Sequence, residues 1–150
     1  MRETTLCYIE QNDCYLMLHR TKKKADGSYE KWLGVGGKLE MGETPEQCVR
    51  RETLEETGYI LGDVSFRAKI YFYSDLWEDE IMYLYTSSSF TGQQIPCDEG
   101  ELVWVKKSEI SSLNIWQGDK LFLERIAEES PYFELELRYK GDELISHKFM

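Results

Sequence analysis

At residues 37–58 the chain reads GKLEMGETPEQCVRRETLEETG, a stretch that crowds acidic side chains at its end. On a helix over residues 45–57, spacings of three and four residues place Glu52, Glu55 and Glu56 on one face. The last two also lie in the final turn, where the helix dipole is negative, and each exposed charge there costs about 0.3–1 kcal/mol. Some other interaction must therefore offset this repulsion.

Two explanations for the acidic face remain open from its spacing alone. The first is a solvated surface, which is the ordinary role of clustered glutamates. The second is a hard divalent cation, Mg²⁺ or Mn²⁺, which prefers carboxylate, carbonyl and water oxygens and reverses the local repulsion. Packing is a poor explanation, because Leu54 projects away from Val49 and Cys48 on such a helix.

The helix has clear signals at both ends. Thr44 is a favoured N-cap residue, Pro45 suits the first helical position, and Gln47 completes a capping box with Thr44. Gly58 is typical of the position just past a helix. These signals predict a helix that begins at Pro45 and ends before Gly58.

A glycine-rich loop precedes the helix. Its sequence, LGVGGKLEMGE (33–43), holds four glycines in eleven residues, and such backbone can approach a ligand closely or turn a carbonyl toward a metal. The combined spacing of loop and helix resembles the Nudix box of the Nudix hydrolases, which pairs a glycine, a glutamate, an RE dipeptide, an EE dipeptide and a closing glycine. The matching positions are Gly37, Glu43, Arg51, Glu52, Glu55, Glu56 and Gly58.

This resemblance implies a fold and an activity. The fold is an α/β, Nudix-type α/β/α sandwich with a mixed, mostly antiparallel sheet and two main helices, in a single domain over residues 1–150. The activity is hydrolysis of a diphosphate linkage in a nucleoside diphosphate derivative, with bound Mg²⁺ or Mn²⁺. Glu43 and Arg51 would form an ion pair that holds the loop against the helix. The residues that the resemblance assigns to the metal are the Gly36 carbonyl, Glu52, Glu55 and Glu56.

The general base differs between members of the family, and the sequence offers two candidates. Glu52 belongs to the box, whereas Glu99 lies in PCDEGELVW (96–104) and resembles an extra metal-linked glutamate of the MutT-like branch. An acidic surface loop is the alternative for Glu99. We rank Glu52 ahead of Glu99 as the base that takes a proton from the attacking water.

The resemblance to the MutT-like branch extends beyond the box. The segments that carry it are WLGVGGK (32–38), DEGELVW (98–104) and NIWQGDK (114–120). That branch hydrolyses oxidised purine nucleoside triphosphates, such as 8-oxo-dGTP, to monophosphate and pyrophosphate. Trp116 would stack on the purine and Asp119 would bond the base edge. The alternatives are an ordinary core aromatic for Trp116 and a helix N-cap for Asp119.

Three positions depart from the family pattern. Leu33 stands where human-type members have an asparagine, and Gly118 stands where they have a second aspartate. Thr53 replaces a bulky aliphatic residue, and its hydroxyl needs a partner if it is buried. Arg20 and Lys38 are the cations best placed for triphosphate oxygens, with solvated surface charge as the alternative.

Composition limits the kinds of partner. Twenty-eight acidic residues against 18 basic ones give a net charge of −10, which disfavours direct binding of a nucleic-acid backbone. No apolar run reaches about 18 residues, so we expect a cytoplasmic protein without a membrane span. Either a monomer or a homodimer is expected. The scattered cysteines form no CxxC pair and are expected as buried thiols: Cys7, Cys14, Cys48 and Cys97.

Alternation and turn residues predict the remaining elements. A polar loop is expected at residues 21–31, a second helix at Asp119–Glu129, and a closing hairpin around the KGD turn at 140–142. The predicted strands are Thr4–Glu10, Cys14–Arg20, Val64–Tyr73, Ile81–Ser88, Glu101–Val105, 133–139 and 143–149.

The sequence therefore favours a Mg²⁺-dependent pyrophosphohydrolase that removes oxidised purine nucleotides, with a role in nucleotide-pool sanitation and DNA repair. A Nudix hydrolase of a dinucleoside polyphosphate, ADP-ribose or an unmodified nucleotide is the next candidate. A nucleotide sensor without turnover ranks lower, because the three helix glutamates are intact. A purely structural protein leaves the spacing from Gly37 to Gly58 unexplained.

Overall fold

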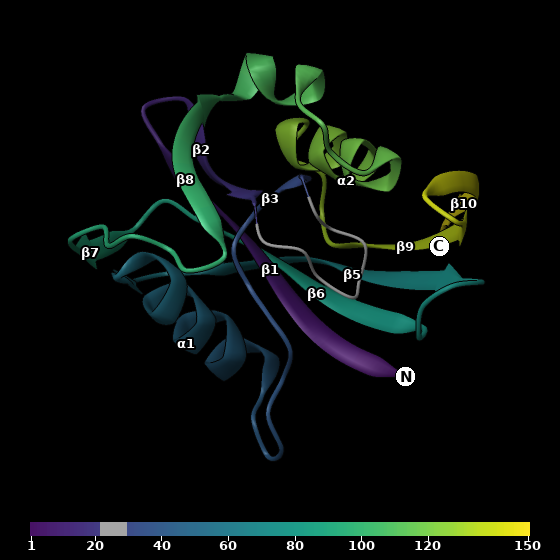
Figure 1. The fold of residues 1–150 in the computed structure, drawn as a ribbon, viewed down its shortest axis with the longest axis horizontal. Coiled ribbons are helices and arrows are strands. Elements are labelled where there is room, and N and C mark those ends of the chain that lie inside the picture. Colours follow the sequence, from purple (N-terminus) through teal and green to yellow (C-terminus); the bar gives the residue numbers. More distant parts are fainter. Residues whose placement is uncertain (22–29) are drawn as a thin grey trace.

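The structure is a computed structural model that describes residues 1–21 and 30–150. A twisted sheet forms its centre, with α1 (Pro45–Thr57) on one side and α2 (Gln117–Ala127) on the other (Figure 1). The expected α/β/α sandwich is confirmed. Within the described residues, no helix is both long enough and apolar enough to cross a bilayer.

The main sheet has eight strands among the described residues, in the order β10-β9-β5-β6-β1-β2-β3, with β8 also paired to β2. The β1–β6 and β5–β9 pairs are parallel and the other described pairs are antiparallel, so the sheet is mixed as expected. Its strands are β1 (Arg2–Gln11), β2 (Cys14–Arg20), β3 (Trp32–Leu33), β5 (Ser65–Ser74), β6 (Glu80–Ser87), β8 (Gly100–Lys106), β9 (Phe133–Lys140) and β10 (Glu143–Phe149).

Alternating side chains of β1 explain why both faces of the sheet are covered. Leu6 and Tyr8 pack in the core beneath α2, whereas Cys7 and Ile9 pack in a second core with Val49 of α1. Because successive side chains of a strand point to opposite faces, an apolar run in β1 supplies both cores. Helices α1 and α2 are thereby attached to opposite faces of one strand.

The ends of α1 follow the sequence signals. The Gln47 amide donates to the Thr44 side-chain oxygen at 3.1 Å, and the Thr44 amide donates to the Gln47 side chain at 2.9 Å. The helix ends before Gly58, whose amide donates to the Leu54 carbonyl. Leu54 is exposed, whereas Cys48 and Val49 are fully buried, so the apolar face that the helix buries is narrow.

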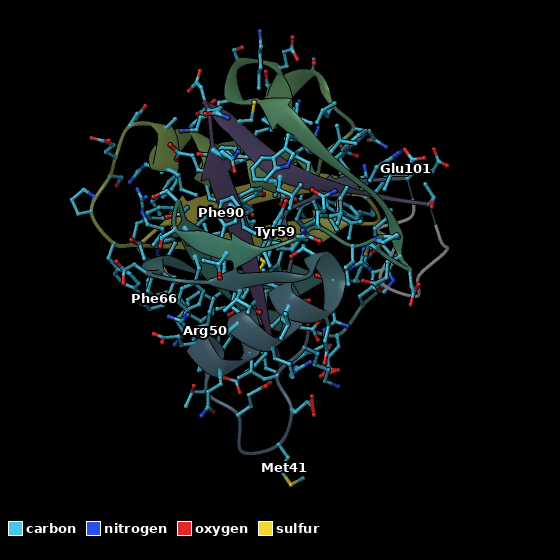
Figure 2. The ribbon with its side chains drawn as sticks, turned by 90° about the vertical axis from the view of Figure 1, so that its left-hand side faces the viewer. Met41, Arg50, Tyr59, Phe66, Phe90 and Glu101 are labelled. Carbon is cyan, nitrogen blue, oxygen red and sulfur yellow. The ribbon has the colours of Figure 1, made fainter. Side chains whose placement is uncertain are left out.

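A small second sheet lies beyond the end of α1. It pairs β4 (Tyr59–Leu61) with β7 (Phe90–Gly92), and Tyr59 and Phe90 meet there with ring centroids 4.8 Å apart (Figure 2). These strands, the short β3 and a 3-10 helix at Lys107–Ser112 were not expected from the sequence. Each is too short for a period of alternation to be recognised.

Two other expectations need correction or fall outside the structure. Helix α2 begins at Gln117 with Trp116 as its N-cap residue, so the alternative that Asp119 caps this helix is wrong. The start at Gln117 was not predicted from the sequence, because its N-cap residue, Trp116, makes no side-chain capping hydrogen bond. The polar loop expected at 21–31 lies mostly outside the described residues, which omit 22–29.

Thr53 is fully buried, and its hydroxyl has no hydrogen-bond partner among the described residues. The hydrogen-bond partner that a buried Thr53 hydroxyl was expected to need is therefore not found among the described residues. Thr57, one turn later and equally buried, donates its hydroxyl to the Thr53 carbonyl at 2.7 Å and accepts from the Tyr59 amide at 3.0 Å. The two threonines provide a matched comparison of an unsatisfied and a satisfied buried hydroxyl.

We predict that Thr53→Val raises the free energy of unfolding by about 1 kcal/mol, because it removes an unsatisfied polar group at constant shape. Thr57→Val should lower it by about the same amount or more, because the Tyr59 amide loses its acceptor. Urea unfolding of both variants measures the difference. Destabilisation by Thr53→Val as large as that by Thr57→Val would contradict this reading.

Candidate active site

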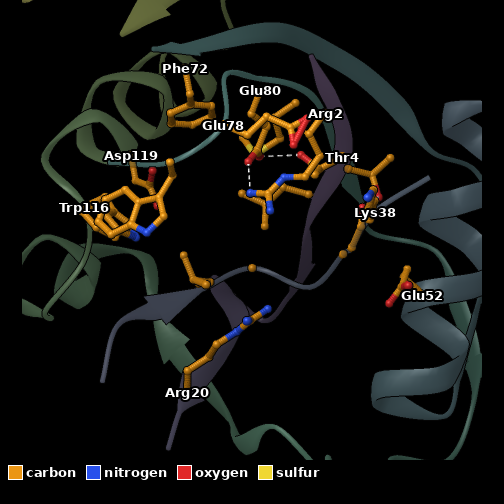
Figure 3. A pocket seen from close by; sticks show the side chains of 18 of the residues that line it. Arg2, Thr4, Arg20, Lys38, Glu52, Phe72, Glu78, Glu80, Trp116 and Asp119 are labelled. Atoms are coloured by element: carbon orange, nitrogen blue, oxygen red, sulfur yellow. Dashed lines mark hydrogen bonds and ion pairs between the residues drawn. The ribbon is translucent and has the colours of Figure 1, made fainter. Parts of the chain in front are cut away.

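One cavity of about 420 Å³ joins the glycine-rich loop to α2 and to the connection between β5 and β6 (Figure 3). Its volume lies within the range of small-molecule sites, about 300–1,000 Å³. Eight of the twelve residues to which the sequence analysis gave a catalytic, metal or substrate role line it: Arg20, Leu33, Gly36, Lys38, Glu52, Glu99, Trp116 and Asp119. The other four are not among its lining residues and belong to the loop and α1: Glu43, Arg51, Glu55 and Glu56.

Arg51 of α1 holds the glycine-rich loop against the helix through hydrogen bonds. The Arg51 guanidinium donates to both oxygens of Glu43, at 2.7 Å from Nε and 3.0 Å from Nη2. It also donates to the Lys38 carbonyl at 3.2 Å. Hydrogen bonds from Arg51, and next from the Glu40 amide, lower the pKa of Glu43 to about 2. The carboxylate is therefore ionised at neutral pH and holds the loop in place.

The same guanidinium neutralises part of the acidic face. Its Nη1 donates to Glu52 at 2.8 Å and to Glu55 at 3.2 Å. Charge-assisted hydrogen bonds of this kind offset repulsion between neighbouring carboxylates. Arg51 thus binds Glu43 and two of the three crowded glutamates.

Glu56, the third glutamate, points inward and is 8% exposed. It accepts a hydrogen bond from the Gly36 amide at 3.0 Å. Burial, and next a hydrogen bond with Glu99, raise the pKa of Glu56 well above its ordinary value. Loss of water and a neighbouring carboxyl group both disfavour the charged form of this side chain.

Glu52 lies against the backbone of the glycine loop. A Cβ atom at Gly37 would stand 2.4 Å from the Glu52 Cδ atom, so a side chain at position 37 would displace this carboxylate. Burial raises the pKa of Glu52, and the neighbouring Arg51 opposes that shift. The glycine of the box is needed here for close approach.

The donor chemistry of this end of the cavity fits a hard divalent cation. Carboxylate oxygens dominate, and the Glu56–Glu99 pair is a buried acidic site that a cation would neutralise. In the part of the chain that the structure describes, no group of three or more acidic, histidine or cysteine side chains is already arranged to hold a metal ion. Arg51 holds Glu52 and Glu55, and these carboxylates must turn from it to meet a metal.

The opposite end of the cavity is aromatic. The Trp116 ring meets Tyr139 edge-on at 5.5 Å and Trp77 edge-on at 6.2 Å, and the Lys31 ammonium lies 4.7 Å from its centroid. Trp116 therefore packs against the core and also lines the cavity. A base that stacks on such a ring gains about 1–3 kcal/mol.

Asp119 lies beside Trp116 and is 4% exposed. Burial raises the pKa of its carboxyl group to about 8, the nearby Lys31 charge opposes this shift, and the Glu80 charge adds to it. Asp119 is therefore mostly neutral at pH 7. A neutral carboxyl group donates one hydrogen bond and also accepts, which suits recognition of a base edge.

Tyr139 explains the glycine at position 118. The Gly118 amide donates to the Tyr139 hydroxyl at 2.8 Å, and a Cβ atom at 118 would stand 2.7 Å from that oxygen. The space that a second aspartate would need is filled by the tyrosine. Leu33 supplies an apolar part of the same cavity wall.

Arg20 and Lys38 both line the cavity. The Arg20 side chain is 14% exposed and its Nη2 lies 3.8 Å from a Glu99 oxygen, so solvated surface charge is the wrong description of it. Figure 3 shows Lys38 on the side of Glu52 and Arg20 reaching into the cavity from another wall. Both cations can meet an anionic ligand there.

Sequence reasoning missed a further group of cavity residues. Arg2 and Glu80 face each other because β1 and β6 are parallel partners with Arg2 opposite Glu80. The pairing of strands so distant in sequence leaves no local signal. The missed residues that line the cavity include Arg2, Thr4, Phe72, Trp77, Glu80 and Tyr139.

Comparison with known proteins agrees with this geometry. The sequence model of the NUDIX domain family matches residues 2–126. An oxidized purine nucleoside triphosphate hydrolase from Danio rerio is 29% identical over 130 residues, which cover 85% of this chain and 81% of that protein. A nucleoside triphosphatase NudI from Salmonella agona is 31% identical over 74% of this chain and 87% of its own.

Solved structures show the same fold. A MutT protein from Bacillus halodurans superposes with a TM-score of 0.87 over 99% of this chain and 97% of its own, at 23% identity. A MutT NUDIX hydrolase from Burkholderia pseudomallei gives a TM-score of 0.74 over 83% of this chain and 97% of its own, at 21% identity. At these identities the likeness is one of fold.

The raised pKa of Asp119 predicts how stability depends on pH. The folded protein holds this proton up to about pH 8, whereas the unfolded chain loses it near pH 3.8. Wild-type protein should therefore lose stability relative to Asp119→Asn as the pH rises from about 4 to 8, because the amide does not titrate. Urea unfolding across this pH range measures the difference in the free energy of unfolding between the two proteins.

Asp142→Asn, in the exposed turn between β9 and β10, is the control for loss of an acidic side chain outside the core. A constant difference in the free energy of unfolding between wild type and Asp119→Asn would mean that the buried carboxyl group has an ordinary pKa. A difference that moved in the opposite direction would contradict the burial of a neutral acid.

Proposed function

The chain belongs to the Nudix domain family of hydrolases, and from that membership we propose that it is a Mg²⁺-dependent nucleoside triphosphate pyrophosphohydrolase. Its proposed substrates are oxidised purine nucleotides such as 8-oxo-dGTP, which it converts to monophosphate and pyrophosphate in the cytoplasm. The observation that carries the proposal is the single cavity that has Glu52 and Glu99 at one end and Trp116 and Asp119 at the other.

The acidic end suits the hydrolytic step. Glu52, Glu55, Glu56 and Glu99 would hold the cation with the Gly36 carbonyl, and a bound cation neutralises phosphate oxygens and activates water. Glu52 accepts the proton of the attacking water in this proposal, ahead of Glu99. Burial already raises the pKa of Glu52, which improves a carboxylate as a base.

The remaining cavity residues bind the nucleotide. Arg20 and Lys38 contact phosphate oxygens, which fixes the position of the reacting phosphorus. Trp116 stacks on the purine and Asp119 bonds its edge. Stacking tolerates any base, so discrimination comes from hydrogen bonds, since a wrong base leaves a buried polar group unpaired.

A different nucleotide is the second candidate, and two positions favour it. Leu33 and Gly118 supply no side-chain hydrogen bond, although both lie where human-type members place polar side chains. A substrate such as a dinucleoside polyphosphate, ADP-ribose or an unmodified nucleoside triphosphate fits the same acidic end. A sensor without turnover is disfavoured, because Glu52, Glu55 and Glu56 are all present.

Steady-state hydrolysis of 8-oxo-dGTP and dGTP in Mg²⁺, with the products identified, tests the substrate. We expect kcat/KM to favour the oxidised nucleotide by about ten-fold or more, as one well-placed hydrogen bond can provide, with monophosphate and pyrophosphate as products. Equal values would select the second candidate. Binding without turnover would select a sensor.

Glu56→Gln tests the role of the buried glutamate in turnover. The amide has nearly the shape of the carboxyl group and can accept from the Gly36 amide, so the free energy of unfolding should change little. The kcat value should nevertheless fall by about a hundred-fold or more, because an amide does not replace an anionic metal ligand. Glu46→Gln, at an exposed position of the same helix, should retain wild-type turnover. A Glu56→Gln enzyme with normal kcat would refute the assignment.

A further inference from the structure

Glu80 places a carboxylate in the wall of the cavity. One of its oxygens pairs with the Arg2 guanidinium, and the other accepts from the Thr4 hydroxyl at 2.6 Å. The Glu80 side chain is 17% exposed, and all three residues line the cavity. The first residues of strand β1 thus fix the orientation of the Glu80 carboxylate on β6.

This acid breaks the apolar pattern of its strand. Met82 and Leu84 follow at alternate positions on β6 and belong to the core beneath α2. Residues two apart on a strand share a face, so Glu80 continues an apolar row with a charge. Removing a charged pair from water carries a large desolvation penalty, and departures from local rules concentrate at functional sites.

The Glu80 carboxylate, which lines the cavity, retains acceptor capacity beyond these two hydrogen bonds. Each oxygen of an ionised carboxylate has two lone-pair sites. Arg2 takes a site on one oxygen and Thr4 takes a site on the other. A second site on each oxygen gives two neighbouring acceptors, which match a ligand edge that presents two neighbouring N–H donors.

Glu80 interacts electrostatically with the aromatic end of the cavity. Its charge contributes to the raised pKa of Asp119, so the two acids lie within electrostatic reach of each other. Figure 3 shows Glu80 and Arg2 between the side of Trp116 and Asp119 and the side of Lys38 and Glu52. A nucleotide that spans the cavity passes this carboxylate.

We propose that Glu80 is a specificity-determining residue that selects guanine-type purines by accepting their N1–H and 2-amino hydrogens, with Arg2 and Thr4 as positioning residues. This inference deepens the proposed function and rests on it for the identity of the ligand as a nucleotide. An adenine-type base is rejected because its N1 lone pair faces the carboxylate. Glu80 thereby supplies the polar contact that Leu33 and Gly118 lack.

A panel of deoxynucleoside triphosphates separates the two donors. The panel consists of dGTP, dITP, which lacks the 2-amino group, the 2,6-diaminopurine analogue, which lacks N1–H, and dATP, which lacks both. Wild type should follow this order, with dGTP best. In Glu80→Gln, kcat/KM for dGTP should fall by about ten-fold, mainly through KM, whereas the value for dATP should stay within about two-fold.

Three further variants test whether Thr4 and Arg2 act by positioning Glu80. Thr4→Val should lower the preference for dGTP partially, because it frees the orientation of Glu80. Arg2→Met should do the same more strongly, since it also leaves the Glu80 charge uncompensated. The control is Glu136→Gln, which breaks a comparable ion pair with Arg138 on β9, and it should leave the preference unchanged.

Equilibrium binding makes the test independent of turnover. The same four bases as monophosphates are titrated calorimetrically against wild type and Glu80→Gln. Loss of the dGMP preference in the variant supports the inference, whether or not the triphosphates are hydrolysed. An unchanged preference, an equal loss of affinity for all four bases, or no nucleotide binding by wild type would overturn it. Absence of hydrolysis with intact dGMP selectivity would instead count against the proposed function alone.

Discussion

Repulsion among the carboxylates at the end of α1 is the constraint on which the rest of the site depends. Arg51 offsets it for Glu52 and Glu55 by hydrogen bonds to both. Glu56 is removed from water, and burial and the neighbouring Glu99 raise its pKa. A carboxylate face of this kind is costly without a counterion, so the cation site that we propose depends on these contacts. Arg51 also binds Glu43 and the loop carbonyl of Lys38, so one guanidinium sets both the charge and the shape of the acidic end.

The sheet determines what faces that acidic end. Strand β1 packs Val49 of α1 on one face and the core beneath α2 on the other. The start of β1 lies against β6, which brings Glu80 to Arg2. Trp116 and Asp119 arrive from the first turn of α2. The cavity therefore combines an acidic end from the glycine loop and α1 with an aromatic end from the other layer.

Local features of this design were predictable from sequence, whereas long-range ones were not. The capping box at Thr44 and Gln47 and the extent of α1 follow from side-chain and backbone hydrogen bonds within one turn, and they are confirmed. The parallel pairing of β1 with β6 depends on the whole sheet, so Arg2 and Glu80 were missed. The neutral state of Asp119 depends on burial, which its position in the chain does not reveal. Gly118 showed as a departure from the family pattern, but its cause, the Tyr139 hydroxyl, required the structure.

The central claim is that the acidic face of α1 binds a divalent cation. Calorimetric titration of metal-free protein with Mn²⁺ tests it most directly, with wild type compared against Glu52→Gln and Glu46→Gln. We predict saturable binding by wild type and Glu46→Gln, and affinity at least about ten-fold weaker in Glu52→Gln, since loss of one anionic ligand removes more than about 1.4 kcal/mol. The same affinity in all three proteins, or no binding by wild type, would contradict the account.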